Sequence, residues 1–463
     1  MKSVFQDVSL LDRKCYEQYL LSEDLLMEHA ATGLKNALPQ NAQSVLIVSG
    51  PGNNGADGIA LARMIQGDYD QVLLHLPYGA KSKMAKLQLE RAQSVGIVVT
   101  EEPVESDVVV DALFGSGLSK PLDETAEKLI DTLNSYEGYK IACDIPTGID
   151  LFGNIQKNAF AADVTVTMGA LKYALYSDLA KDYVGEIVCV DLGVSHLLYE
   201  NKTDTYLLEI EDLKLPLRDT KNCHKGSFGH LNVIAGKKVG AGVIAAEAAY
   251  AFGVGLVTLI ENEPYPIPFE LMRSTTLTSN ATAICIGMGL GNQFDNAYLA
   301  KFLLDHELPV LIDADLFYHE ILHEVLQKKK NLVLTPHPKE FASLLKITGF
   351  GDVTVTQIQQ DRFGWARKFS QKYPDLVLVL KGANTLIAHQ SNIYIQPFGT
   401  NVLSKGGSGD VLGGLIAALL AQGYTLLDAA ISGSIAHALS AKNFDKNNYA
   451  LRPTDLIEGV KSL

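Results

Sequence analysis

Apolar and polar residues alternate along the chain in a pattern that is typical of repeated strand and helix units. Short runs rich in Val, Ile and Leu predict buried strands, and the longer segments between them, with apolar residues at helical spacing, predict helices. In the first half, strands are expected at 44–49, 71–76, 106–112, 140–145, 163–168 and 186–193, with helices at 58–66 and 83–95. Strands that alternate with helices form a parallel sheet covered on both faces, so a doubly wound α/β domain is predicted.

A segment rich in charged residues, Pro and Gly interrupts this pattern at 206–229. The alternation then resumes, and strands are expected at 230–236, 255–260, 283–289, 309–315, 331–336, 375–382 and 392–397. Two long apolar helices are expected at 409–423 and 425–441. We therefore predict two α/β domains, 1–210 and 211–463, because a chain of 463 residues is too long for one ordinary core.

Charge and composition narrow the class of protein. The formal net charge of −14 at pH 7 disfavours binding to nucleic acid, whose phosphates would be repelled. The sequence shows no apolar run of membrane-spanning length and no signal-peptide core at its N-terminus. The five cysteines are scattered and never form a C-x-x-C pair, which is typical of proteins in a reducing compartment. We expect a cytoplasmic enzyme or binding protein with no membrane or nucleic-acid partner.

A glycine-rich loop, GPGNNGADG, follows the first predicted strand at 50–58. Its glycines allow a ligand to approach the backbone, and the amides at the start of the following helix can bind an anion. The spacing matches neither G-x-G-x-x-G nor the P-loop, and no lysine is present to reach a phosphoryl group in transfer. The loop therefore predicts binding of a phosphate without its transfer. Asp57 could contact the ligand, cap the helix, or do both.

Polar side chains also follow later strands of the first domain. Asp111 and Asp144 each end a predicted strand and precede a turn. Ligands bind at the carboxyl ends of parallel strands, so these groups are expected near the glycine-rich loop. Asn54, Asp111 and Thr147 offer hard oxygen ligands that suit a monovalent cation. Asp144 would then be free for acid–base work on a ligand held by the loop at 114–121.

A second glycine-rich loop, SKGGSGD, precedes the long helix near the C-terminus at 404–410. Successive glycine amides at a helix N-terminus form an anion hole, and Asp410 beside it is placed to act as a general base. The alternative is a loop that only joins and caps two elements. The segment KGANT, 381–385, follows a strand and could contact a nucleotide.

Three more groups near strand ends of the second half have two possible roles each. His337, in TPHPKE, could cap a helix or take part in catalysis. Asp313 and Asp315 could bind Mg²⁺ or cap the helix that follows. The stretch from His319 to His323 fits the H-E-x-x-H zinc pattern, but its apolar residues fall on one helical face, so a solvated helix surface is favoured.

Taken together, these segments resemble the bifunctional NAD(P)H-hydrate repair enzymes, in which an NAD(P)HX epimerase domain is joined to an ADP-dependent (S)-NAD(P)HX dehydratase domain. In the first half the resemblance rests on LLMEHA, GPGNNGADG, DALFGSGLSKP and DIPTGID. In the second half it rests on HKGSFGH, GMGLG, IDAD, TPHPKE, KGANT and GGSGDVLGG. The resemblance implies a Rossmann-like first domain and a ribokinase-like second domain.

The resemblance also implies a set of site residues in each domain. In the first domain it implies that the hydrated cofactor is bound by Asn53, Asn54, Gly55, Ala56, Asp57, Gly115, Ser116, Gly117, Leu118, Ser119, Lys120, Pro121 and Asp144, and K⁺ by Asn54, Asp111 and Thr147. In the second domain it implies that NAD(P)HX is bound by Ala241, Gly289, His337 and Asp410, and the adenine nucleotide by Lys381, Gly382, Ala383, Asn384, Thr385 and Gly409. Asp144 and Asp410 would be the catalytic carboxylates.

The chemistry implied is the repair of NADHX and NADPHX, in which the dihydropyridine ring carries water at C6. The first domain would interconvert the R and S epimers, and the second would dehydrate the S epimer at the expense of ADP, with Mg²⁺. A homo-oligomer is expected. The alternative is a ribokinase-like kinase for a vitamin or sugar with a non-catalytic first domain.

Two departures from the family pattern stand out. Ala56 replaces the second glycine of NNGGD, which is tolerable if its φ is negative. Tyr318 stands where the family's DADALN pattern ends in asparagine, which puts a role for that position in doubt.

Overall fold

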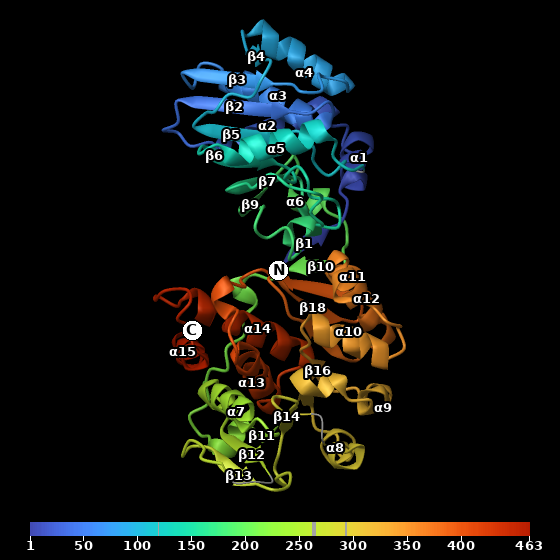
Figure 1. Ribbon diagram of the computed structural model, residues 1–463, viewed down its shortest axis with the longest axis vertical. Coiled ribbons are helices and arrows are strands. Elements are labelled where there is room, and N and C mark those ends of the chain that lie inside the picture. The colour runs from blue at the N-terminus through green and yellow to red at the C-terminus, as the bar shows by residue number, and fades with distance from the viewer. Residues whose placement is uncertain (119, 262–264, 292–293) are drawn as a thin grey trace. The chain divides into compact units, whose positions relative to one another are not determined.

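The computed structural model describes residues 1–118, 120–261, 265–291 and 294–463. The described residues divide into two compact units, Ser3–Thr203 and Asp204–Leu463, the latter together with Met1–Lys2 (Figure 1). The division precedes the boundary that the sequence predicts at 210/211. The reason is that β10 (Thr205–Leu207) pairs in parallel with β19 (Asn392–Gln396) and so belongs to the second unit.

The first unit is built on a parallel sheet with the strand order β4-β3-β2-β5-β6-β7-β9. Every neighbouring pair in this order is parallel. The strands are β2 (Ser44–Ser49), β3 (Gln71–His75), β4 (Val98–Thr100), β5 (Val108–Ala112), β6 (Tyr139–Cys143), β7 (Val164–Met168) and β9 (Glu186–Val190). The strand order reverses between β2 and β5, and ligands bind at such a switch point in doubly wound folds.

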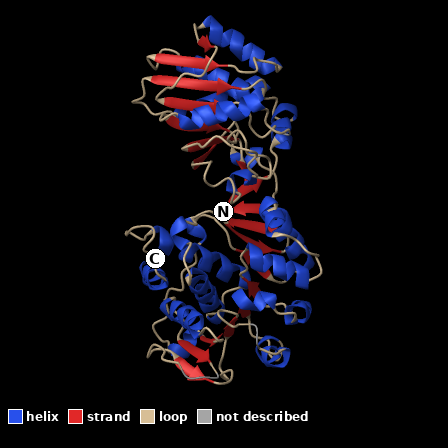
Figure 2. Cartoon of the chain, in the orientation of Figure 1, coloured by secondary structure: helices blue, strands red, loops and turns tan. Residues whose placement is uncertain are grey.

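Both faces of this sheet are covered by helices, as Figure 2 shows. Val45 and Ile47 of β2 pack with residues of α1 (Ser9–Glu17), α2 (Glu23–Asn36), α3 (Asn53–Ile65) and α4 (Lys83–Ser94). Leu46 and Val48, which point to the opposite face, pack with α5 (Glu124–Ser135). The alternation of side chains along a strand explains why a continuous apolar run fills two cores at once.

A short parallel pair that the sequence pattern did not predict adjoins this core. β1 (Lys2–Phe5) pairs with β8 (Leu171–Lys172), with Val4 opposite Leu171. The segment continues into the 3₁₀ turn Tyr173–Tyr176, and the short helix α6 (His196–Tyr199) follows β9. Runs of two to four residues carry too little periodicity to be recognised.

The second unit contains a longer mixed sheet with the order β13-β12-β11-β14-β15-β16-β17-β18-β19-β10. The strands from β13 to β17 are parallel, and β18 is antiparallel to both of its neighbours. The remaining bounds are β11 (His230–Ile234), β12 (Leu256–Ile260), β13 (Met272–Ser274), β14 (Ala283–Ile286), β15 (Val310–Ile312), β16 (Leu332–Leu334), β17 (Val377–Leu380) and β18 (Thr385–His389). β18 was not predicted, because the glycine loop before it obscured its short apolar run.

Helices again lie on both sides of the strands (Figure 1). The main core is formed with α7 (Val239–Ala251), α13 (Ser408–Ala421), α14 (Leu426–Lys442) and α15 (Pro453–Gly459). The other side carries α8 (Asn296–Leu303), α9 (Ile321–Lys328), α10 (Pro338–Ile347), α11 (Val355–Gln360) and α12 (Arg362–Lys372). The α/β class predicted for both halves is confirmed. Within the described part of the chain, no helix combines the length and the apolar character that crossing a bilayer requires.

Candidate active sites

A cavity of about 420 Å³ opens at the carboxyl ends of the central strands of the first unit. It is bounded by the loops that follow β2, β5 and β6 and by residues of α1 and α2. Eight of the residues predicted from the sequence line it: Asn53, Asn54, Asp57, Gly115, Ser116, Gly117, Leu118 and Asp144. The topological switch point of the sheet therefore coincides with the cavity.

The loop GPGNNGADG leads directly into α3, which begins at Asn53 with Gly52 as its N-cap. Gly52 has no side chain to cap this end, so within the described residues its backbone amides are available to an anion at the cavity wall. Asp57 lies beyond the first turn and is not a cap, which answers one of the questions left by the sequence. Ala56 is a fully buried residue of the helix and has no positive φ, so its methyl group is accommodated.

Carboxylates that the sequence did not single out also line this cavity. Asp12 comes from α1 and Glu23 from α2. Tyr199 donates a hydrogen bond of 2.7 Å to Asp12 Oδ1. Burial, together with the charges of Asp144, Asp12 and Glu23, raises the pKa of Asp57 well above its ordinary value. This shift favours the protonated form of Asp57, which is the form that can donate a proton.

The pKa of Asp144 is shifted in the opposite direction, downward. Asp144 follows β6 with a φ of 70° and is buried. Burial alone would raise the pKa of Asp144, but the Lys172 ammonium, 2.7 Å from Oδ1, holds it below its ordinary value. Two carboxyl groups on one cavity thus have pKa values shifted in opposite directions, upward for Asp57 and downward for Asp144, an arrangement suited to acid–base chemistry.

The predicted K⁺ ligands include a hydrogen-bonded pair. Thr147 Oγ1 lies 2.7 Å from Asp111 Oδ1, and the Thr147 amide donates to Oδ2 at 2.8 Å. Burial raises the pKa of Asp111 to about 6 in spite of these hydrogen bonds. The side-chain amide nitrogen of Asn54 is buried without a hydrogen-bond partner among the described residues. The Oδ1 of Asn54 lies close to Gly115, since a Cβ added to Gly115 would be 2.6 Å from it. This group of carboxylate, amide and hydroxyl oxygens is chemically suited to K⁺.

The remaining predicted residues of this loop extend away from the main cavity. Lys120 and Pro121 line a neighbouring depression of about 280 Å³, which also includes Gly117 and Leu118. Ser119 lies outside the described residues.

In the second unit, Lys381 connects several groups that are far apart in the sequence. Its ammonium lies 2.7 Å from Asp313 Oδ1 and 3.6 Å from Glu340 Oε2. Thr335 also donates to Asp313 Oδ1, at 2.8 Å. Asp313 makes no side-chain cap to the 3₁₀ turn Ala314–Tyr318, and the Oδ2 of Asp315 accepts the Gly291 amide at 2.8 Å. Neither carboxylate thus caps the turn that follows.

The GGSGD loop forms the start of α13, with Gly407 as the N-cap. Gly407 has a φ of 90°, and a Cβ there would lie 2.5 Å from Pro453, so only glycine fits. A Cβ on Gly409 would lie 3.6 Å from Lys381 Nζ and 4.0 Å from Asp313 Oδ2, which places the helix N-terminus beside this charged group. Burial and the charge of Asp313 raise the pKa of Asp410 to about 7, against the opposing effect of Lys381.

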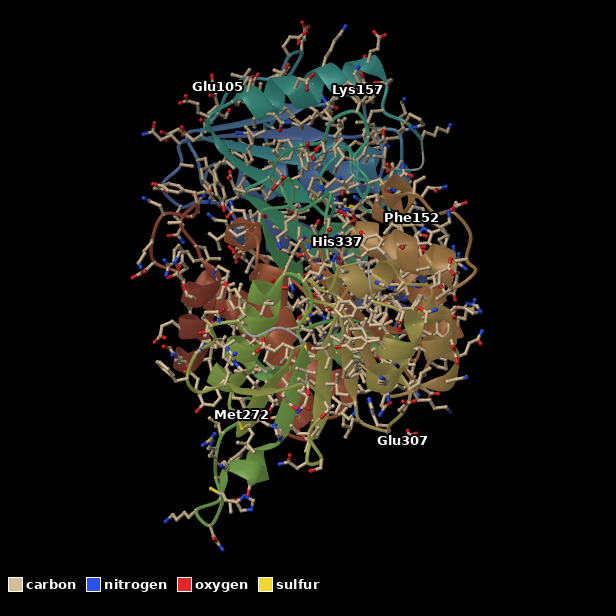
Figure 3. All side chains as sticks on the ribbon, turned by 60° about the horizontal axis from the view of Figure 1, so that its bottom comes forward. Glu105, Phe152, Lys157, Met272, Glu307 and His337 are labelled. Atoms are coloured by element: carbon tan, nitrogen blue, oxygen red, sulfur yellow. The ribbon has the colours of Figure 1, made fainter. Side chains whose placement is uncertain are left out.

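His337 caps α10, one of the two roles that the sequence left open. Its Nδ1 accepts hydrogen bonds from the amides of Lys339 and Glu340, and its Nε2 lies 3.1 Å from Glu340 Oε1 (Figure 3). Since both ring nitrogens have partners, a contact of His337 with a ligand would use the face of the ring. Ala241 and Gly289 are neighbours, because a Cβ on Gly289 would lie 3.1 Å from that of Ala241.

The segment KGANT joins β17 to β18, with Gly382 exposed and Asn384 buried. The buried Arg362 of α12 donates to the carbonyl oxygens of Leu380, Lys381 and Asn384 at 3.0, 3.2 and 3.0 Å. This arginine fixes the backbone on both sides of the loop. No sequence pattern indicates this role, because the partners of Arg362 are backbone groups.

Comparison with known proteins decides the family. Over its whole length the chain is 46% identical to the bifunctional NAD(P)H-hydrate repair enzyme of Helicobacter pylori, and it covers all of that protein. The chain belongs to the bifunctional NAD(P)H-hydrate repair enzymes. The enzyme of this name from Coxiella burnetii is 35% identical, with 98% of this chain and 97% of that protein covered. The function predicted from the sequence is thereby confirmed at the level of the family.

Two family models match separate parts of this repair enzyme. Residues 23–174 match the YjeF-related protein N-terminus, and residues 231–461 match NAD(P)H-hydrate dehydratase. Among solved structures, the ADP/ATP-dependent NAD(P)H-hydrate dehydratase of Bacillus subtilis, co-crystallised with ATP/Mg²⁺, is 26% identical, with a TM-score of 0.47. The similarity covers 54% of this chain and 92% of that one.

The zinc-like pattern of the repair enzyme has a local structural explanation. His319 precedes α9, and its Nε2 lies 3.2 Å from the carbonyl oxygen of Gly291. His323, on α9, faces the carbonyl oxygen of Ile347 instead, at 3.1 Å. The two imidazoles thus bind backbone groups of different segments. In the described part of the chain, no group of three His, Cys, Asp or Glu residues is placed to hold a metal ion.

Proposed function

We propose that the first unit interconverts (R)- and (S)-NAD(P)HX and that the second unit dehydrates the S epimer with ADP. The observation that carries this proposal is that each unit has its own carboxylate site. Asp144 is ionised beside a cavity in the first unit, whereas Asp410 stands at a helix N-terminus next to Lys381 in the second. The expected ligands are small molecules. We also propose that the protein is cytoplasmic and forms a homo-oligomer.

In the first unit, the cofactor's phosphates would bind the free amides at the start of α3, and its hydrated ring would lie against Asp144. The residues that line this space are Asn53, Asn54, Asp57, Gly115, Ser116, Gly117 and Leu118. Asp144 and Asp57 would act as base and acid, because their pKa values are shifted in opposite directions in the same cavity. K⁺ bound by Asn54, Asp111 and Thr147 would supply a fixed positive charge near the phosphates.

In the second unit, ADP would bind Lys381 to Thr385 and Gly409, with its phosphates at the N-terminus of α13. The hydrated ring would lie near Ala241, Gly289 and the ring face of His337. Asp313 Oδ1 is occupied by Lys381 and Thr335, while Oδ2 lies toward Gly409. That second oxygen is suited to Mg²⁺ carried by the nucleotide, whose chemistry is to neutralise phosphate charge.

The net reaction that this site supports removes water from the C6 position. Asp410 accepts the proton of the C6 hydroxyl as that oxygen attacks the β-phosphorus of ADP, which releases AMP. Loss of phosphate from C6 and of a proton from C5 then restores the double bond of NAD(P)H. Lys381 and the amides of the GGSGD loop stabilise the charge of the phosphoryl group in transfer.

The proposal predicts the fate of chemically prepared NADHX that contains both epimers. With ADP present, the whole of it should return to NADH, because the first unit feeds the R epimer to the second. Without a nucleotide, no NADH should form. The measurement is the absorbance of the reduced nicotinamide ring over time.

Two controls sharpen this assay. Replacing K⁺ in the buffer by tetramethylammonium, which is too large for the site, should slow consumption of the R epimer while leaving that of the S epimer unchanged. Candidate vitamins offered with ATP should give no stable phosphorylated product, and the appearance of one would favour a small-molecule kinase.

Asp410 also predicts a pH dependence of the dehydratase. Since the base must be ionised and its pKa is about 7, kcat/KM for (S)-NADHX should fall as the pH drops through neutrality, by roughly tenfold per unit below the pKa. The quantity kcat/KM reports on the free enzyme, which is the form described above. Initial rates at low substrate check this, and a profile that stays flat through neutral pH would remove Asp410 as the base.

A further inference from the structure

Lys172 is a fully buried lysine whose ammonium lies 2.7 Å from Asp144. It also donates to Thr167 Oγ1 at 2.9 Å and to the carbonyl oxygens of Met168 and Ala170 at 3.0 and 3.3 Å. A buried charge is costly unless it is paired and hydrogen-bonded. Because these four oxygens surround the ammonium, its position is fixed by the fold.

The two oxygens of the Asp144 carboxylate have different surroundings. Oδ1 faces Lys172, the Thr167 hydroxyl at 3.2 Å and the Met168 amide at 3.3 Å. Oδ2 accepts from the Ser116 amide at 3.3 Å, and it would lie 3.3 Å from a Cβ on Gly115. Ser116 and Gly115 belong to the loop that lines the cavity. One oxygen is therefore anchored in the protein while the other is directed at the ligand space.

The fold brings Lys172 to this place by a local route. The chain turns sharply after β7, at Gly169 with a φ of 75°, and returns as β8. β8 is held by β1, with Phe5 opposite Lys172. Lys172 thus lies on a short strand whose position is held by backbone pairing with β1.

We propose that Lys172 is the positioning residue of the epimerase site, with its ammonium holding Asp144 ionised and oriented so that Oδ2 faces the substrate. This inference rests on the proposed role of Asp144 in epimerisation. It assigns to Lys172 no contact with the substrate and no proton transfer.

The charges around Asp144 show why such a cation is needed. Among the described residues, the titratable groups that interact electrostatically with Asp144 are Lys172, Asp12, Asp57, Cys143, Cys189 and Tyr199. In this set Lys172 carries the positive charge, and the other groups are neutral or negative. Without it, burial and the nearby carboxylates would favour the protonated form of Asp144.

The test is the pH dependence of (R)-to-(S) conversion in Lys172→Met, followed on the purified R epimer in the full chain. The acid limb of kcat should be displaced upward by about one to three pH units, so that the variant loses activity at acidic pH values at which the parent is still active and regains it at higher pH. KM should change little, because Lys172 does not contact the substrate. Lys157→Met is the matched control: this exposed lysine of the same unit pairs with Glu127 at the surface (Figure 3).

Chemical rescue gives a readout that a merely structural lysine would not. Lys172→Ala removes the ammonium and leaves space for a small cation, so methylammonium or ethylammonium should restore conversion on the displaced acid limb, while tetramethylammonium should not. If neither variant folds, as judged by its melting temperature, Thr167→Val replaces them. That change removes the hydroxyl that bridges Lys172 and Asp144, and a smaller displacement of the acid limb in the same direction is expected.

An unshifted acid limb in every variant that folds, or a uniform loss of activity at all pH values without amine rescue, would overturn the inference. Asp144→Asn separates this failure from that of the proposed function. If Asp144→Asn abolishes conversion while the Lys172 and Thr167 variants keep the parental pH profile, Asp144 stands as the base and Lys172 does not position it. If Asp144→Asn converts the R epimer normally, Asp144 is not the base of the epimerase site and the proposed function of that site is wrong.

Discussion

Asp410→Asn is expected to abolish ADP-dependent formation of NADH from (S)-NADHX, with a loss in kcat of roughly a hundred- to ten-thousand-fold. The change removes the base beside the anion hole but keeps the size and shape of the side chain. Because burial and the charge of Asp313 raise the pKa of Asp410 to about 7, the native side chain is already partly neutral. The neutral amide should therefore cost the fold little. The loss is measured by single-turnover kinetics on the purified S epimer.

The control for this variant is the binding of ADP. Removal of a carboxylate next to the phosphates should not weaken binding, which titration calorimetry measures. Asp428→Asn, on the surface of α14 and paired with Lys214, is the matched substitution and should leave kcat unchanged. Dehydration at the parental rate in Asp410→Asn would remove Asp410 from the catalytic role.

Asp144→Asn is expected to stop the conversion of the R epimer by a comparable factor while the S epimer is still dehydrated. Asparagine fills the same space but can neither accept a proton nor balance the charge of Lys172. The recovery of NADH from mixed epimers should therefore halt at the S fraction, apart from spontaneous epimerisation. The plateau of the absorbance trace measures this directly.

The second unit serves as an internal control for the Asp144 variant. Dehydration of purified (S)-NADHX at the parental rate shows that this unit of the protein is intact. Asp150→Asn gives a matched comparison in the same segment, because Asp150 accepts hydrogen bonds from its own turn, at Phe152 and Asn154. Full recovery from mixed epimers in Asp144→Asn would exclude Asp144 as an epimerase residue.

The main parts of both sites could be predicted from the sequence because their signals are local. A glycine-rich loop after a strand, or a carboxylate at a strand end, is visible within a few residues. Parallel sheets place all such ends at one edge. Asn54, Asp57 and Asp144 therefore line one cavity, although their segments are far apart along the chain.

The residues that the sequence did not reveal act through contacts that no local pattern records. Asp12 lies on α1 and reaches the cavity through packing of that helix. In the sequence, Lys172 cannot be distinguished from an exposed lysine of a loop. Its burial depends on the pairing of β8 with β1. Arg362 binds backbone carbonyl oxygens, and because every residue has one, these partners cannot be recognised from the sequence. Contacts of this kind are set by tertiary structure.

The central claim is that epimerisation and dehydration occur at separate sites, one in each unit. The most direct test offers purified (R)-NADHX and ADP to Asp144→Asn, to Asp410→Asn and to an equal mixture of both. Each variant alone should form no NADH above the spontaneous rate, whereas the mixture should convert the R epimer completely, because the S epimer released by one protein is dehydrated by the other. A mixture as inactive as its components would contradict the account.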